Sequence, residues 1–230
     1  MTKAKVGARA PVTEAPEEAE VEWGRRAVVP LLVMAILISA VAGSGLLVGK
    51  FLERPIPSAL AKCQATSVQI GPRDYLGPQP MCITASQQFD ATINTTQGPV
   101  VIRLHPEVAP VTVNNFIVLA LHGYYDGLTF WKSEDWVVQS GDPQNNGSGG
   151  PGYSLPDEPS QTPWGLAAMG MARVPGGSVN GGQFFIQKAA WPGSGPTAVY
   201  NRFGTVTSGM GFVQLLTSSD TITSISIKAF

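Results

Sequence analysis

Residues 137–158 read VVQSGDPQNNGSGGPGYSLPDE, and residues 170–186 read GMARVPGGSVNGGQFFI. In both stretches a short apolar run lies next to a tract rich in glycine and other turn-forming residues. Apolar runs of about four to eight residues that are bounded by such tracts are typical of β-strands. The two stretches therefore predict strands joined by glycine-rich loops, which indicates a mainly β protein.

The sequence on either side continues this pattern and adds two helices. Residues 89–93 and 100–104 are apolar runs separated by a turn that contains glycine, which predicts a hairpin. Apolar residues recur at helical spacing over residues 110–123 and again over residues 209–216, which predicts two helices. The other apolar runs expected to form short strands are residues 136–138, 165–172, 183–186, 203–206 and 222–227.

The composition excludes some classes of function. Lys and Arg number 15 against 16 Asp and Glu, with no basic stripe, so a nucleic-acid partner is not expected. The 2 cysteines have no clustered histidines beside them, which predicts no zinc or other metal site. The 26 Gly and 19 Pro fit a chain of many turns and short strands better than a helical bundle.

Near the N-terminus, residues 27–49 carry no charge over 23 residues, AVVPLLVMAILISAVAGSGLLVG. A helix of this length spans about 34 Å, which is enough to cross a hydrocarbon core of about 30 Å. These residues therefore predict a transmembrane helix, and they make the lipid bilayer a partner of the chain. Residues 1–26 balance 5 basic with 5 acidic side chains and hold few large apolar groups, which predicts a disordered tail.

The charges that flank residues 27–49 orient the expected helix. Two arginines precede it directly, whereas Lys50 and Arg54 follow it, so the positive-inside rule favours a cytoplasmic N-terminus. The chain is therefore expected to be a single-pass protein of the cell membrane. Its main domain, residues 87–230, is expected to lie outside the cytoplasm. A cleaved signal peptide is the alternative, since the small residues SAVAGSG resemble a cleavage site. The apolar run continues past those small residues, which favours the span.

A stretch rich in Pro and Gly, residues 50–86, is expected to form a stalk or an irregular collar before the main domain. It contains both cysteines of the chain, Cys63 and Cys82. An oxidising compartment outside the cytoplasm lets such residues pair, and we favour a disulfide between them. Closing a loop of this size stabilises the fold by about 3 kcal/mol on the chain-entropy model.

Four ordered segments resemble the cyclophilins, the β-barrel peptidyl-prolyl isomerases, and the resemblance extends from Phe89 to the C-terminus. Residues 137–158 look like the family's Gln-Gly-Gly-Asp turn with its glycine-rich loop, and residues 170–186 like its Met-Ala-Arg and Gln-Phe-Phe-Ile elements. APVTVNNFIVLALHGYYDGLTF at 109–130 looks like its first helix and next strand, and YNRFGTVTSGM at 200–210 like its Phe-Gly-x-Val turn. The resemblance implies an eight-stranded antiparallel barrel, packed inside and capped by a helix at each end. It implies no metal and no organic cofactor.

The resemblance also implies a peptide-binding groove on the outside of the barrel. In the family a proline side chain enters an apolar pocket, while an arginine and two glutamines hold the peptide backbone. The expected catalytic residues are Lys132, which stands at the position of the family arginine, and Gln139. The substrate-binding positions that carry over are Trp136, Val137, Ala172, Gln183, Phe185 and Tyr200.

Lys132 departs from the family pattern, and the segment between it and Gln139 is one residue shorter. Arginine presents several donors in a rigid planar fork, whereas lysine offers one compact charge on a flexible stem, so the exchange is not conservative. We expect reduced isomerase activity, and Glu134 and Asp135 are expected to draw the ammonium away from the groove. The groove aromatics, taken alone, are more typical of a packed core, and only the matched segments assign them to a pocket.

Two functions are compatible with these observations. The first is a peptidyl-prolyl isomerase that acts on proline-containing segments of exported or membrane proteins. The second is a non-catalytic subunit that uses the same barrel and is tethered by its helix to a larger membrane complex. Lys132 and the small residues at 43–45 of the apolar run favour the second.

Overall fold

The expected strands form and join into one antiparallel sheet in the computed structural model, which describes residues 56–173, 176–193, 195–196 and 198–230. This confirms a mainly β fold, in which turn residues end each strand near the expected position. The strands of the described residues are β1 (Phe89–Thr95), β2 (Pro99–Leu104), β3 (Lys132–Ser133), β4 (Val137–Ser140), β5 (Ser154–Leu155), β6 (Ala168–Arg173), β7 (Val179–Gln187), β8 (Arg202–Ser208) and β9 (Ile222–Ala229).

The sheet closes at a seam between its two ends. The strand order is β3-β4-β7-β6-β8-β2-β1-β9, and β5 pairs with β7 off this path. Just before β3, Gly127 N donates to Ile222 O at 2.7 Å, and Phe130 N donates to Asp220 O at 3.0 Å. Eight strands were expected, and the described part of the chain has nine. The additional strand is the two-residue β5, which pairs with β7 beside the glycine-rich loop.

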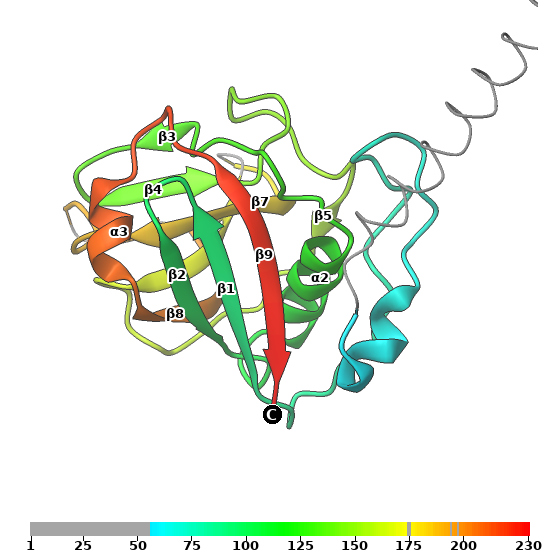
Figure 1. The fold of residues 1–230 in the computed structure, drawn as a ribbon. Coiled ribbons are helices and arrows are strands. Elements are labelled where there is room, and N and C mark those ends of the chain that lie inside the picture. The colour runs from blue at the N-terminus through cyan, green and yellow to red at the C-terminus, as the bar shows by residue number, and fades with distance from the viewer. Residues whose placement is uncertain (1–55, 174–175, 194, 197) are drawn as a thin grey trace, which may run out of the picture. The chain divides into compact units, whose positions relative to one another are not determined.

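The two α-helices of the described residues lie on opposite sides of the sheet (Figure 1). α2 (Pro110–Leu121) and α3 (Met210–Leu215) form where the apolar spacing predicts them. α2 directs Phe116 into the core, where its ring lies 5.1 Å from that of Tyr125 and 5.3 Å from that of Phe203. Side chains therefore pack the inside of the barrel, as expected.

Residues 56–86 pack against the barrel and are here called the collar, which is one of the two arrangements expected for this stretch. The collar begins with a 3₁₀ helix, η1 (Ser58–Gln64). Leu60 is 1% exposed and Tyr75 is 3% exposed, and both belong to the same apolar core as the strands. Large apolar side chains lie among the prolines of this segment, and burying them against the barrel is favourable.

Polar contacts and a disulfide fasten the collar. Cys63 and Cys82, which are 19 positions apart, are joined by a disulfide with their Cα atoms 5.1 Å apart. The buried side chain of Asn114 on α2 accepts a hydrogen bond from Cys82 N at 2.8 Å and donates to Pro80 O at 3.0 Å. The collar thus belongs to the same compact unit as the barrel, residues 54–230.

The predicted tail, residues 1–26, and the predicted transmembrane helix, residues 27–49, lie outside the described residues. Among the residues that are described, none of the helices has both the length and the apolar character needed to cross a membrane.

Candidate functional site

Three neighbouring strands bury apolar side chains on both of their faces. Because side chains alternate along a strand, Val138 on β4 and Phe184 on β7 point into the barrel core. Val137 and Phe185, one position away, point outward and form a second apolar cluster with Ala172 on β6. The sheet therefore carries an apolar surface on its exterior, separate from its core.

Strand register brings Lys132, Gln139 and Phe185 into one row across this exterior surface. Lys132 pairs with Gln139 between β3 and β4, and Gln139 pairs with Phe185 between β4 and β7. The next position of the row, on β6, is Gly170, where a Cβ atom would lie 2.5 Å from the ring of Trp164 and 2.8 Å from that of Phe185. A glycine is therefore required here for these rings to pack over the strand.

A pocket of about 300 Å³ opens over this row. All the residues predicted to form the groove line it: Lys132, Trp136, Val137, Gln139, Ala172, Gln183, Phe185 and Tyr200. The lining also includes residues that the sequence did not single out: Trp131, Gly147, Arg173, Asn180 and Trp191.

Aromatic rings form one wall of the pocket, and Trp191 is at its centre. The ring centroid of Trp191 lies 5.0 Å from that of Trp136, 5.2 Å from that of Tyr200 and 5.8 Å from that of Phe185. Trp164 stacks on Phe185 with centroids 5.4 Å apart. Such ring pairs stabilise packing beyond the area they bury, so the wall is preorganised for an apolar side chain.

Amide groups form the facing wall. Gln139 Nε2 donates to Gln183 Oε1 at 2.8 Å. Gln183 Nε2 donates in turn to Gly147 O at 3.0 Å and to Gly149 O at 2.6 Å, which holds the glycine-rich loop against the pocket. Asn180 supports the same loop by donating to Gly149 O at 3.0 Å.

Lys132 lies at the rim of the pocket and is paired with an acid. Its Nζ is 3.2 Å from Glu134 Oε1, and Glu134 Oε2 accepts a hydrogen bond of 2.7 Å from Trp136 Nε1. The side chains of Lys132 and Glu134 are 36% and 46% exposed, so the pair is worth only about 0–1 kcal/mol. The ammonium thus pairs with Glu134, one of the two acids expected to draw it from the groove, but Lys132 still lines the pocket and a substrate can detach it at low cost.

Lys188 fixes the hairpin that carries Lys132. Its Nζ donates to Ser133 Oγ and to Leu216 O, both at 2.9 Å, and its backbone N donates to Trp136 O at 2.8 Å. Lys188 is 8% exposed, and this burial lowers the pKa of its amine. The β3–β4 hairpin is therefore tied to β7 and to the end of α3.

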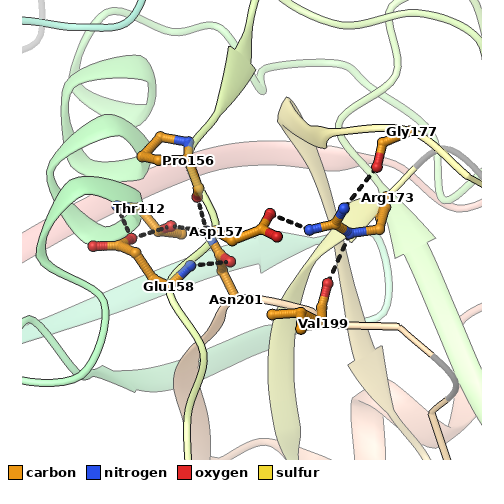
Figure 2. Close-up of polar contacts among 8 residues, drawn as sticks. All are labelled: Thr112, Pro156, Asp157, Glu158, Arg173, Gly177, Val199 and Asn201. Atoms are coloured by element: carbon orange, nitrogen blue, oxygen red, sulfur yellow. Dashed lines mark hydrogen bonds and ion pairs between the residues drawn. The ribbon is translucent and has the colours of Figure 1, made fainter.

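Arg173 on β6 holds the segment that leads to Tyr200 (Figure 2). Its guanidinium donates to Val199 O at 2.7 Å and to Gly177 O at 2.6 Å, and it forms an ion pair with Asp157. Its side chain is only 14% exposed, because these partners surround it. The guanidinium thus positions the backbone beside the aromatic wall.

Glu158, next to Asp157 in the sequence, caps a helix instead (Figure 2). Its carboxylate accepts hydrogen bonds of 2.9 Å from Val111 N and Thr112 N, at the start of α2. The residue before this helix offers no side-chain cap, so Glu158 satisfies amides that would otherwise be unpaired.

Within the ranges that the structure describes, no three His, Cys, Asp or Glu side chains gather closely enough to hold a metal ion. The chemistry of the site is that of an apolar hollow beside amide groups and one ammonium. Such a site suits an extended peptide, whose apolar side chain enters the hollow while its backbone bonds to the amides. The fold and the site therefore define a peptide-binding β-barrel.

Comparisons with known proteins identify the family. Residues 90–228 match the family model of the cyclophilin type peptidyl-prolyl cis-trans isomerases. The chain is 38% identical over 127 residues to peptidyl-prolyl cis-trans isomerase B of Bacillus subtilis. The aligned region covers 54% of this chain and 87% of that protein. It is 39% identical over 104 residues to a putative peptidyl-prolyl cis-trans isomerase of Staphylococcus haemolyticus. This aligned region covers 43% of this chain and 52% of that protein.

A solved structure of the same class resembles the fold. A cyclophilin type peptidyl-prolyl cis-trans isomerase of Cryptosporidium parvum, crystallised in the presence of the dipeptide Ala-Pro, superposes with a TM-score of 0.54 at 26% identity. The match covers 60% of this chain and 98% of that one. The chain belongs to the cyclophilin-type peptidyl-prolyl cis-trans isomerase family, and it is an enzyme of that class.

Proposed function

We propose that the pocket isomerises X-Pro bonds with Lys132 as the donor to the twisting bond. The observation that carries the proposal is the row formed by Lys132, Gln139 and Phe185 across three strands. Phe185 forms the floor on which a prolyl ring packs. Gln139 bonds to the peptide backbone, and Lys132 reaches the bond that rotates.

The reaction requires no covalent step. An X-Pro bond isomerises slowly because its C–N bond has partial double-bond character, with a barrier of about 18–20 kcal/mol. When the bond twists, the proline nitrogen loses conjugation and becomes a better hydrogen-bond acceptor. A donor fixed beside it binds the twisted form better than either planar form, and only such differential binding lowers the barrier.

A lysine in this role gives lower activity than an arginine. The ammonium is compact and strongly hydrated, and its flexible stem must be ordered in the transition state. Losing one preorganised transition-state donor costs about 100- to 1,000-fold in rate. This is the largest loss of rate expected when lysine replaces arginine. The pair with Glu134 adds a small further cost.

The sequence supports a place for this activity at the membrane. Residues 27–49 are long and apolar enough to anchor the chain, and the charges around them favour a main domain outside the cytoplasm. Proline-containing segments of exported or membrane proteins are the corresponding substrates. A non-catalytic subunit of a membrane complex is the second candidate, favoured by the Lys132–Glu134 pair at 3.2 Å.

A protease-coupled isomerase assay on the full chain in detergent separates the two candidates. Lys132→Arg is expected to raise kcat/KM, and Lys132→Met to lower it, by less than the roughly 100- to 1,000-fold that losing a preorganised donor costs. Lys228→Met, an exposed lysine on β9 outside the pocket lining, is the matched control and leaves activity unchanged. An inactive wild type that stays inactive with Lys132→Arg, and that purifies with a stable membrane complex, supports the subunit instead.

A further inference from the structure

The collar concentrates exposed apolar side chains. Of the 9 large apolar side chains that are well exposed in the described residues, 4 lie within residues 68–81. These are Val68, Ile70, Leu76 and Met81, which are 65%, 62%, 68% and 55% exposed. An apolar group of this kind at one place on a surface marks a site of contact.

A short hairpin gathers three of these side chains on one face. Gln69 and Tyr75 pair as an antiparallel bridge, and Leu76 N donates to Val68 O at 2.9 Å. Because side chains alternate along each arm, Val68, Ile70 and Leu76 share the face opposite to Tyr75. Tyr75 is buried in the core, so the shared face of the other three points outward.

The barrel holds this hairpin in place. Tyr75 N donates to Pro151 O at 2.9 Å. Arg73 donates to Tyr124 O at 2.8 Å and to Asp126 O at 2.5 Å. Together with the disulfide of the collar, these contacts present the apolar face on a fixed support.

The length and charge of the chain point to what covers the face. The collar has only 3 charged residues, Lys62, Arg73 and Asp74, and Arg73 is bound to the barrel. The uncharged run ends at Gly49, and the chain from there to Ile56 reaches at most about 25 Å. A membrane span at residues 27–49 therefore keeps the collar close to the bilayer surface.

We propose that the face formed by Val68, Ile70 and Leu76 rests on the lipid surface of the bilayer that the span crosses. This inference rests on the proposed membrane anchor. Apolar side chains that enter the headgroup boundary hold a domain at a fixed orientation. The same hairpin bonds to Pro151, at the end of the glycine-rich loop that carries Gly147 of the pocket lining, so a docked collar also holds this loop.

Lipid quenching on the full chain in phospholipid vesicles tests the contact. A fluorescent thiol label is placed at Leu76→Cys, with the disulfide kept oxidised, and the vesicles contain brominated lipids. Leu215→Cys is the matched control, because Leu215 is 60% exposed and lies on α3, at the opposite side of the molecule from the collar (Figure 1). The proposal expects quenching several-fold stronger at position 76 than at position 215.

Equal quenching at the two positions overturns the inference. Shielding of position 76 from aqueous iodide without lipid quenching also overturns it, because a second copy of the chain then covers the face. A carbonate wash of the same vesicles shows separately whether the anchor holds. Isomerase activity measured in those vesicles reports on the pocket, so failure of the docking and failure of the proposed function are distinguishable.

Discussion

Glu134 Oε1 lies 3.2 Å from Lys132 Nζ, and its other oxygen accepts a hydrogen bond from Trp136 Nε1. Glu134→Gln removes the charge while its amide oxygen can still accept from Trp136. We expect kcat/KM to rise by at most about fivefold, because an exposed ion pair is worth about 0–1 kcal/mol. Glu107→Gln, a change at an exposed acid outside the pocket lining, is expected to have no effect. A large fall in kcat/KM would show that Glu134 takes part in catalysis.

Gln183 is expected to support both the pocket and the fold. It is 2% exposed and donates to Gly147 O and Gly149 O. Gln183→Met keeps the length of the side chain but removes its donor from Gly147 O and leaves Gly149 O with Asn180 alone, which costs about 1–3 kcal/mol of stability. Urea unfolding measures this loss, and the isomerase assay is expected to show a higher KM. Gln88→Met, at an exposed position, is the control and leaves both quantities unchanged.

Asp220 is expected to make the stability of the fold depend on acid pH. Burial acts to raise the pKa of this carboxyl, but hydrogen bonds from Thr96, Gln97 and Thr217 outweigh it and lower the pKa to about 2, from 3.8. Since the folded pKa is below the unfolded one, the stabilisation is present above pH 3.8 and is lost as the pH falls toward 2. The shift corresponds to about 2 kcal/mol.

Asp220→Asn isolates this effect in urea unfolding at several pH values. The variant is expected to be less stable than the wild type by about 2 kcal/mol at pH 7. The gap between the two proteins is expected to shrink as the pH falls through the window from 3.8 to about 2. A gap that is constant with pH would mean that the charge of Asp220 does not stabilise the fold.

The disulfide is expected to stabilise the collar without taking part in catalysis. Replacing both Cys63 and Cys82 by Ala opens a loop of 19 positions and costs about 3 kcal/mol on the chain-entropy model. We expect a lower Tm and unchanged kcat at a temperature where the variant is folded. Reductant is expected to lower the Tm of the wild type in the same way and to leave that of the variant unchanged.

Much of the fold was predictable from the sequence because it depends on local patterns, whereas the pocket was predictable only through the resemblance to a family. Successive side chains of β4 and β7 point to opposite faces of the sheet, which separates Val137 and Phe185 from the core. Turn residues set where each strand ends. The roles assigned to Lys132, Gln139 and the substrate-binding residues all came from that resemblance. Strand register, which places Lys132 and Gln139 directly opposite each other, is a finding of the structure.

Other parts depend on contacts between distant segments, which single-sequence patterns do not contain. Glu158 caps a helix that begins 48 positions earlier in the chain, at Pro110, and nothing near Glu158 signals this partner. Trp164 stands in a loop rich in proline and glycine, so its stacking on Phe185 has no periodic signature. The prolines and glycines of the collar are compatible with either a stalk or an irregular collar, whereas its few large apolar residues decide its packing.

The seam of the barrel also constrains how the protein is made. β9 pairs with β1 along its length, and the residues at its start bond to the segment before β3. Until the ribosome has added β9, β1 has one open edge, and such edges template aggregation. The nascent domain therefore needs protection during translation, and truncation after α3 is expected to leave it unable to complete folding.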